Sequence, residues 1–359
     1  MSRESQDFLL NMLRTPSPSG FESRVQELWR DYVTPMASSY GCDPMGNMWG
    51  KLISSGEQGP KVMVVGHCDE IGLMVTNVTG RGFLHVDGIG GIDPGVIVGS
   101  QISFVHSGAV GVVGRRPVHL VDTDEAAEEK KILKAKDLYV DVGAAGRDEA
   151  EDIAPVGSAA VSSVDPRRMG SGGKFLTGRG LDNRLGSYVA AEVLHTCRKG
   201  RDSGRPLHST LISLSSVQEE LGFHGAKVAA DRLAPHAAIV VDATFATDTP
   251  DEQDKKVAGD VALGRGPVVN IGARVNKRLS KLLVEMDTPH QVQAVPGNTG
   301  TDADVVTLSN CGIPTAVLSI PLRYMHTPVE TCCPGDVEAA IKMISELVFM
   351  IGDEPSVVL

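Results

Sequence analysis

The stretch VMVVGHCDE, residues 62–70, joins a short apolar run to a histidine and two acidic residues. An apolar run of this length, without alternating polar positions, is typical of a strand buried on both faces of a sheet. Three later runs lead into residues of the same kind. They are LISLSSVQ before Glu219 and Glu220, AIVV before Asp242, and AVLSIPLRYM before His326. Together the four runs predict a sheet whose strands lead into potential metal ligands.

The position of these residues in a sheet predicts that they converge. In a parallel sheet, the carboxyl ends of all strands lie along one edge, where ligand sites form. We therefore expect His67, Asp69 and the residues that follow the other three runs to meet in one crevice. Carboxylates gathered so closely would repel one another and raise one another's pKa. Divalent cations would remove that repulsion, so the pattern predicts a metal site.

The composition argues against several classes of protein. At 359 residues, the chain is longer than one hydrophobic core usually supports, which favours two domains. Its net charge of −11 argues against nucleic acid as a partner, because phosphate binding needs clustered Lys and Arg. No window holds the roughly 18 apolar residues that a membrane span needs, and the start, MSRESQDFLL, lacks the features of a signal peptide. We expect a cytoplasmic protein with no membrane partner, whose scattered cysteines are free thiols.

The order of apolar segments and turn signals predicts two kinds of structure. Between residues 71 and 165, short Val/Ile-rich segments alternate with turn signals such as TGRG and GIGGID, which indicates an all-β unit. The charge-rich stretch 122–136 within it is expected to be solvated. Elsewhere strands alternate with helices. The predicted fold is α/β: a mostly parallel or mixed sheet covered by helices, formed by residues 1–70 and 166–359, with an inserted barrel-like all-β domain at 71–165.

Individual elements can be placed by their periodicity. Helical spacing predicts helices over 184–199, 225–233 and 334–350, and buried apolar runs predict strands over 62–65, 209–216, 237–244 and 315–321. The sequence Ser19-Gly-Phe-Glu22 has the pattern of a capping box at the start of an earlier helix.

The candidate ligands also indicate which metal they would hold. Imidazole and carboxylate without thiolate suit Zn²⁺ or Co²⁺, with Mn²⁺ a further option, better than Ca²⁺ or Mg²⁺. Two histidines and three carboxylates are too many for one tetrahedral ion with an open position, but they suit two ions that share a bridging carboxylate. Asp182, in the segment GRGLDNRLG ahead of a predicted helix, is the candidate for the bridge.

Six separated motifs carry a resemblance to a known family. In chain order they are GHCDEIGLMV (66–75), LDNRLG (181–186), VQEELGFHGA (217–226), VVDAT (240–244), GTDAD (300–304) and IPLRYMHTPVE (320–330). They resemble the tetrahedral, or deblocking, aminopeptidases, a family of two-metal metallopeptidases of glutamyl and leucyl aminopeptidase type. Some members of that family carry endoglucanase labels. The match covers nearly the whole chain, including the insert.

The resemblance implies a role for each residue of the site. One metal would be bound by His67, Asp182 and Asp242, and the other by Asp182, Glu220 and His326. Glu219 would be the catalytic base, and Asp69 would accept a hydrogen bond from His67 and fix its tautomer. The family usually has a second Asp where this chain has Asn183, which changes the surroundings of the bridging residue. The resemblance also implies a cis peptide bond between Asp182 and Asn183.

Three further residues are candidates for contact with the substrate. Thr301 and Asp302 lie in the Gly-rich segment GTDAD and are expected to line the substrate pocket. Arg323 lies three residues before His326 and could meet a substrate carboxylate. An ordinary salt bridge is the alternative for Arg323.

The reaction that follows from this reading is hydrolysis of the N-terminal residue of short peptides by a water that two metals activate. Removal of acyl groups from amino acids by a related two-metal site, glucanase activity, and an inactive binding scaffold are the alternatives. A glucanase needs two carboxylates flanking a sugar, without metal. The resemblance further implies that the insert drives dimerisation and that dimers assemble into a tetrahedral dodecamer.

Overall fold

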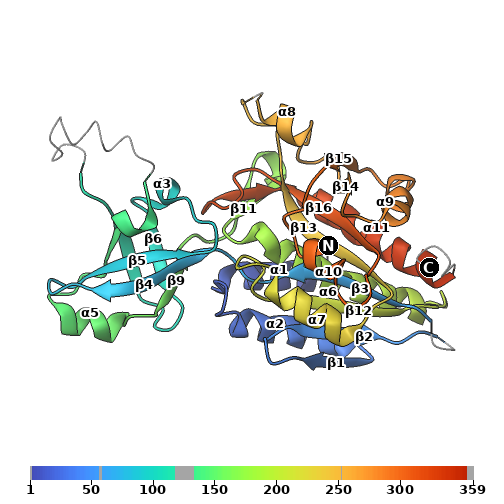
Figure 1. Ribbon diagram of the computed structural model, residues 1–359, viewed down its shortest axis with the longest axis horizontal. Coiled ribbons are helices and arrows are strands. Elements are labelled where there is room, and N and C mark those ends of the chain that lie inside the picture. The colour runs from blue at the N-terminus through green and yellow to red at the C-terminus, as the bar shows by residue number, and fades with distance from the viewer. Residues whose placement is uncertain (1, 56–58, 118–132, 252, 354–359) are drawn as a thin grey trace.

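The computed structural model describes residues 2–55, 59–117, 133–251 and 253–353. Figure 1 shows an α/β part beside a smaller β-rich part. No helix within the described ranges is long and apolar enough to cross a membrane. The mixed α/β class with an inserted β barrel is confirmed.

An eight-stranded mixed sheet forms the α/β part. Its strands, in spatial order, are β1 (Ser39–Cys42), β2 (Met48–Leu52), β12 (Thr210–Ser216), β3 (Lys61–His67), β13 (Ala237–Phe245), β16 (Thr315–Leu322), β14 (Val268–Gly272) and β15 (Gln291–Val295). The four central strands, β12, β3, β13 and β16, are parallel. β2 is antiparallel to β12, and β14 is antiparallel to β16. All four predicted strands are confirmed, and they are the four parallel ones.

Helices cover both faces of this sheet. One face packs against α1 (Arg3–Arg14), α2 (Ser23–Val33), α6 (Leu181–Asp202), α9 (Lys277–Val284) and α11 (Pro334–Asp353). The other face packs against α7 (His224–Leu233) and α10 (Ala303–Val306). In β3, Val62 and Val64 contact the first group, whereas Met63 and Val65 contact the second. The apolar run is continuous because alternate side chains enter two different cores. The three predicted helices correspond to α6, α7 and α11.

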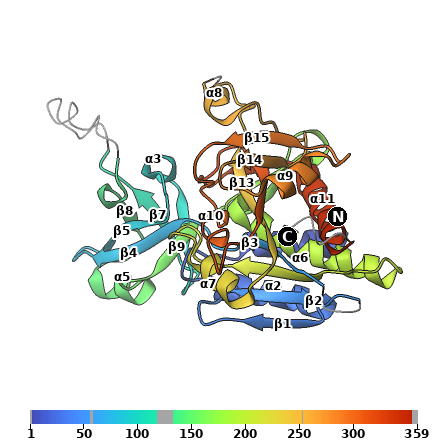
Figure 2. The ribbon, with the colours of Figure 1, turned by 45° about the vertical axis from the view of Figure 1, so that its right-hand side comes forward.

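The β-rich part is a closed antiparallel barrel (Figure 2). Its strands, in order around the barrel, are β4 (Gly72–Val78), β5 (Phe83–Ile89), β8 (Tyr139–Asp141), β7 (Val110–Gly114), β6 (Gln101–Phe104) and β9 (Ala159–Ser162). Helices α3 (Pro94–Ile97) and α5 (Arg147–Ile153) contribute to its core. The first and last strands are neighbours, since Leu73 pairs with Ala160. The chain therefore enters and leaves the barrel at the same place.

The remaining elements are short. A three-stranded sheet consists of β10 (Arg167–Met169), β11 (Phe175–Gly178) and β17 (Glu330–Cys332), and α8 (Asp254–Ala258) follows β13. In the described ranges, 3₁₀ turns cover Thr34–Met36, Ala135–Asp137 and Ser171–Gly173. Most of the stretch 122–136, expected to be solvated, lies outside the described residues.

The predicted capping box at Ser19–Glu22 is wrong. Helix α2 begins at Ser23, with Glu22 as its N-cap and no capping hydrogen bond from a side chain. The Ser19 hydroxyl instead donates to Asp69 Oδ2 at 2.6 Å, and Glu22 Oε1 accepts from the backbone N–H of Gln218 at 3.2 Å. These polar groups serve the buried site at the sheet edge, which outweighs the local capping pattern.

Candidate metal centre

The candidate ligands gather at the carboxyl end of the central strands. His67 is the last residue of β3, and Asp242 lies inside β13, three residues before its end. Glu219 and Glu220 follow β12, His326 follows β16, and Asp182 lies in the first turn of α6. The structure thus brings together, from four strands and one helix, residues that are far apart in the sequence.

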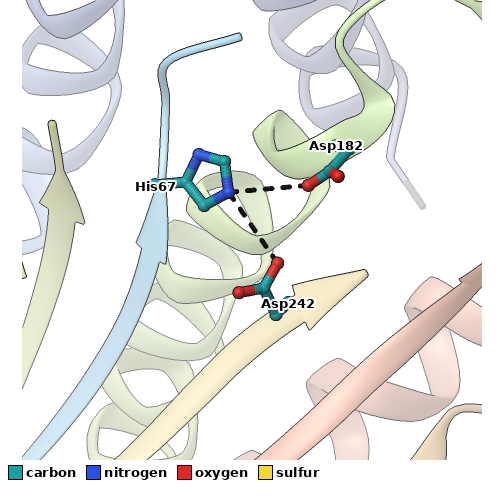
Figure 3. A group of neighbouring side chains, drawn as sticks. All are labelled: His67, Asp182 and Asp242. Carbon is teal, nitrogen blue, oxygen red and sulfur yellow. Dashed lines mark ion pairs between the residues drawn. The ribbon is translucent and has the colours of Figure 1, made fainter. Parts of the chain in front are cut away.

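Three of these side chains form a first group, shown in Figure 3. His67 Nε2 lies 3.5 Å from Asp182 Oδ1 and 3.8 Å from Asp242 Oδ1. Figure 3 shows all three side chains pointing toward one another, from β3, from the start of α6 and from β13. All three are buried. Their ligand atoms are close enough to surround one ion.

A second group shares Asp182 with the first. His326 Nε2 lies 3.3 Å from Asp182 Oδ2 and 3.4 Å from Glu220 Oε1. The two oxygens of Asp182 therefore face different histidines, Oδ1 toward His67 and Oδ2 toward His326. This is the arrangement that a carboxylate bridging two ions requires.

The hydrogen bonding of the cluster fits cation binding. Asp182 Oδ1 and Asp242 Oδ2 are fully buried and have no hydrogen-bond partner among the described residues. A buried carboxylate oxygen without a partner is costly, and a cation would supply the missing interaction. Cys68 adds no thiolate, because its side chain packs in the hydrophobic core and burial raises its pKa well above the usual range. Imidazole and carboxylate ligands of this kind suit Zn²⁺, Co²⁺ or Mn²⁺.

Glu219 lies beside the first group. Its Oε2 is 3.7 Å from His67 Nε2, and its side chain is buried. Burial raises the pKa of Glu219 to about 11. The neighbouring carboxylates of Asp242 and Asp302 also raise this pKa, whereas His67 lowers it. A cation beside Glu219 would lower the pKa too, because an opposite charge favours the ionised carboxylate.

Asp69 contacts His67 and the backbone of both glutamates, and so supports the cluster. Its Oδ1 lies 3.3 Å from His67 Nδ1, and its carboxylate accepts the backbone N–H groups of Glu219 and Glu220 at 3.1 and 3.2 Å. Burial alone would raise the pKa of Asp69, but the interaction with His67 and a hydrogen bond from Ser19 outweigh it and hold the pKa low. One charged carboxylate thus positions both a histidine and the two adjacent glutamates.

Asn183, which follows the candidate bridging residue, donates one hydrogen bond and accepts another through its side chain. Asn183 Nδ2 donates to the backbone oxygen of Val241 at 2.8 Å, and its Oδ1 accepts from the backbone N–H of Gly186 at 2.9 Å. An amide can make both, whereas an ionised Asp has no donor for Val241. The Asp182–Asn183 peptide bond is cis, as the resemblance implies.

The three candidate substrate residues have different surroundings. Thr301 lines the cleft beside the site, while Asp302 does not and accepts a hydrogen bond from the Ser216 hydroxyl at 2.7 Å. Arg323 forms the alternative salt bridge: its Nε and Nη2 each lie 2.7 Å from an oxygen of Asp248. Arg323 is not among the residues that line the cleft.

Two buried acidic residues were missed by the sequence reasoning. Glu330 accepts the backbone N–H of Asp182 at 3.0 Å and that of His326 at 2.9 Å, so it positions two of the three residues of the second group. Its place four residues after His326, at the end of the last motif, was the available signal. Glu70 is the other, and it lies next to Asp69.

Glu70 forms a buried ion network that joins three segments. Its carboxylate accepts Arg179 Nη1 at 2.7 Å, the Ser17 backbone N–H at 3.0 Å, and Arg184 Nη2. The side chain of Arg184 is fully buried. Burial would raise the pKa of Glu70, but the charges of Arg179 and Arg184 outweigh it and keep the pKa below its usual range. The network fixes the segment after His67 to the start of α6, from which Asp182 projects.

Comparisons with known proteins show which family the chain resembles in sequence and in fold. The model of the M42 glutamyl aminopeptidase family matches residues 46–343. The lysyl aminopeptidase of Pyrococcus furiosus is 34% identical over 349 residues, which cover 95% of this chain and 96% of that protein. The crystal structure of a TET aminopeptidase from a marine sediment archaeon of the Thaumarchaeota superimposes with a TM-score of 0.90 at 27% identity, covering 99% of each chain. The TET1 peptidase of Pyrococcus horikoshii, described as assembling into a tetrahedron or a large octahedral shell, has a TM-score of 0.80 at 27% identity and covers 96% of this chain and 99% of its own.

Proposed function

The chain belongs to the M42 glutamyl aminopeptidase family, and from this premise we propose that it is a cytoplasmic enzyme that removes the N-terminal residue of short peptides at a site for two divalent metal ions. Membership makes it a peptidase. The observation that carries the finer proposal is the placement of Asp182 between two histidines, with one carboxylate oxygen toward each.

The ligand sets follow from the two groups of side chains. One ion would be held by His67, Asp182 and Asp242, and the other by Asp182, Glu220 and His326. Bound divalent ions would lower the pKa of a water molecule and polarise the scissile carbonyl. The ligand types favour Zn²⁺ or Co²⁺, with Mn²⁺ also compatible.

The remaining chemistry belongs to the side chains of this protein. Glu219 would take the proton of the attacking water and pass it to the leaving amine, and its burial beside His67 supports this role. Asp69 would accept a hydrogen bond from Nδ1 of His67, which leaves Nε2 directed into the site.

Metal removal is the direct test of this function. Chelator-treated protein should lose hydrolysis of aminoacyl anilides, and Zn²⁺ or Co²⁺ should restore it, because the proposed ligands then recover their ions. Added Ca²⁺ is the matched control and should not restore activity, since it prefers sites made of oxygen ligands. Full activity in protein that contains almost no metal would contradict the proposal. Cleavage of N-acyl amino acids but of no anilide would favour the deacylase.

We further propose that the chain forms homo-oligomers in which the barrel contributes the main contacts, with dimers that build a tetrahedral dodecamer. The assembly named for the P. horikoshii relative supports this proposal.

Deletion of residues 75–160 tests the assembly role of the barrel. A short linker can bridge the gap, because β4 and β9 are paired neighbours. We expect the variant to unfold cooperatively yet to have a much smaller mass by light scattering than the parent protein. A variant that still forms the parent assembly would show that the barrel is not the main assembly element.

A further inference from the structure

The metal centre opens into a cleft of about 770 Å³ between the end of β13 and the strands β14 and β15. β14 pairs with β16 at only two positions, Val268 with Ser319 and Val269 with Leu318. Beyond Val269 it pairs with β15 and no longer with β16. A hydrogen bond of 2.9 Å from the Thr244 hydroxyl to Gln293 joins β15 to the end of β13. The cleft between these strands and the end of β13 lies next to the candidate ligands, where the first residue of a substrate can bind.

The walls of the cleft carry no charge outside the metal centre, within the part of the chain that the structure describes. Its charged lining residues are the two histidines and four carboxylates already described: His67, His326, Asp182, Glu219, Glu220 and Asp242. Two divalent ions would balance the four carboxylates that line the cleft, so these groups would leave no unpaired charge for a substrate side chain. The charged residues of α8, such as Lys256, are not among the lining residues, although Val257 and Ala258 are.

Apolar side chains make up most of what remains. They include Leu221, Phe223, Phe245, Val257, Val295 and Met325. Three of them, Leu221, Phe245 and Val257, expose 46%, 59% and 89% of their surface, so apolar groups face the solvent at this rim. A peptide that covers them would gain the free energy of burying apolar surface.

Among the polar residues that line the cleft, Asn270 differs from the others in its hydrogen bonding. The others have partners: Gln293 donates to the Ala258 backbone oxygen at 2.8 Å, and the hydroxyls of Thr299 and Thr301 lie 2.9 Å apart. Asn270 lines the cleft and is only 4% exposed, yet its Oδ1 has no hydrogen-bond partner among the described residues. An unpaired buried acceptor is costly unless a ligand supplies the donor.

We infer that the cleft selects peptides whose first residue is uncharged and preferably apolar, and that the neutral side chain of Asn270 contributes to this selectivity because it offers no counter-charge to a charged first residue. The inference rests on the aminopeptidase function proposed above. A Lys or Glu side chain would lose water of hydration in the cleft without finding a counter-charge, and this loss is costly. Asn270 can hydrogen-bond a neutral N–H or O–H group of the bound peptide, but its amide cannot neutralise a charge. The relative from P. furiosus is named for lysine. Among the described residues that line this cleft, there is no carboxylate beyond the metal centre to pair with a lysine.

A substrate panel with the metal-loaded protein tests the selectivity. We expect kcat/KM for Leu and Met anilides to exceed that for Lys and Glu anilides by about 10²-fold, because the charged side chains remain unpaired. Calorimetry provides a readout independent of turnover: tripeptides that begin with Leu should bind the inactive Glu219→Gln protein more tightly than those that begin with Lys or Glu. Equal or better cleavage of a Lys or Glu anilide would overturn the inference and leave the proposed function intact. Cleavage of no anilide at all would overturn the function itself.

The variant Asn270→Asp tests the residue. It places a carboxylate in the otherwise uncharged wall, so the ratio of Lys to Leu kcat/KM should rise by about tenfold or more. Asn11→Asp, on the exposed surface of α1, is the matched control and should leave the ratio unchanged. An unchanged ratio in an Asn270→Asp protein that still cleaves the Leu anilide would show that Asn270 does not face the first side chain. If that variant does not fold, the wild-type panel and Asn270→Leu test the inference instead. Asn270→Leu should keep the low ratio of Lys to Leu kcat/KM, and a rise in that ratio would contradict the inference.

Discussion

Replacement of Glu219 by Gln should lower kcat by about 10²–10⁴-fold, the usual loss when a general base is removed. The metal content should stay at the level of the parent protein, because Glu219 belongs to neither group of candidate ligands. Its side chain lies 3.7 Å from His67, so the neutral amide fits the same space without taking a proton from water. Parallel measurement of kcat and of metal per subunit by mass spectrometry gives both quantities.

The adjacent residue provides the matched control. Glu220→Gln is the same chemical change one position along the chain, but Glu220 Oε1 lies 3.4 Å from His326 in the second group. This variant should lose metal as well as activity. If Glu219→Gln lost metal while Glu220→Gln kept it, the two glutamates would have the opposite roles.

Replacement of Glu70 by Gln should lower the free energy of unfolding by about 3–5 kcal/mol, the range for breaking a buried ion pair from one side. The buried guanidinium groups of Arg179 and Arg184 would then share no carboxylate. Urea unfolding at a fixed protein concentration measures the change. Glu346→Gln is the control, because the Arg205–Glu346 pair is partly exposed and such pairs contribute about 0–1 kcal/mol. Equal losses in the two variants would show that the network is no more important than a surface pair.

The same network should make stability depend on pH. The pKa of Glu70 in the folded protein is held below its usual range, so in acid the unfolded chain binds a proton that the folded chain does not. The stabilisation from Glu70 is therefore complete well above pH 4.3, the usual value for Glu, and is lost as the pH falls through the lower folded value. The difference in unfolding free energy between the parent and Glu70→Gln should shrink over that range.

The sequence predicted the central part of the fold because its signals were local. The parallel strands β3, β13 and β16 are mostly apolar, and β12 combines Leu and Ile with small serines, a composition typical of strands buried on both faces. The edge region around β14 and β15 was not predicted. Its strands are short, and β15 alternates half-buried with exposed residues, which gives a weaker signal.

The candidate metal ligands were easier to predict than the hydrogen bonds and salt bridges around them. His67 and Asp242 could be proposed because each follows an apolar run, and the structure places both at one sheet edge. The partner of Arg323 is Asp248, 75 positions away, and no local pattern connects the two. Ser19 was misread for the same reason, since its partner Asp69 lies 50 positions along the chain. Hydrogen bonds between distant segments depend on the finished packing, which sequence patterns do not encode.

The position of the barrel in the chain has a consequence for synthesis on the ribosome. β3 emerges before the barrel, but its neighbours β12 and β13 are made only after the barrel and α6 are complete. At a translation rate of about 5–20 residues per second, β3 waits on the order of ten seconds for its first parallel partner. Val62–Val65, all fully buried in the finished fold, are exposed to solvent meanwhile, and unpaired apolar strands of this kind are prone to aggregate. The barrel strands are contiguous in sequence, so the barrel can fold during that interval. Until β12 is synthesised, the nascent chain therefore combines a folded barrel with an unpaired apolar strand.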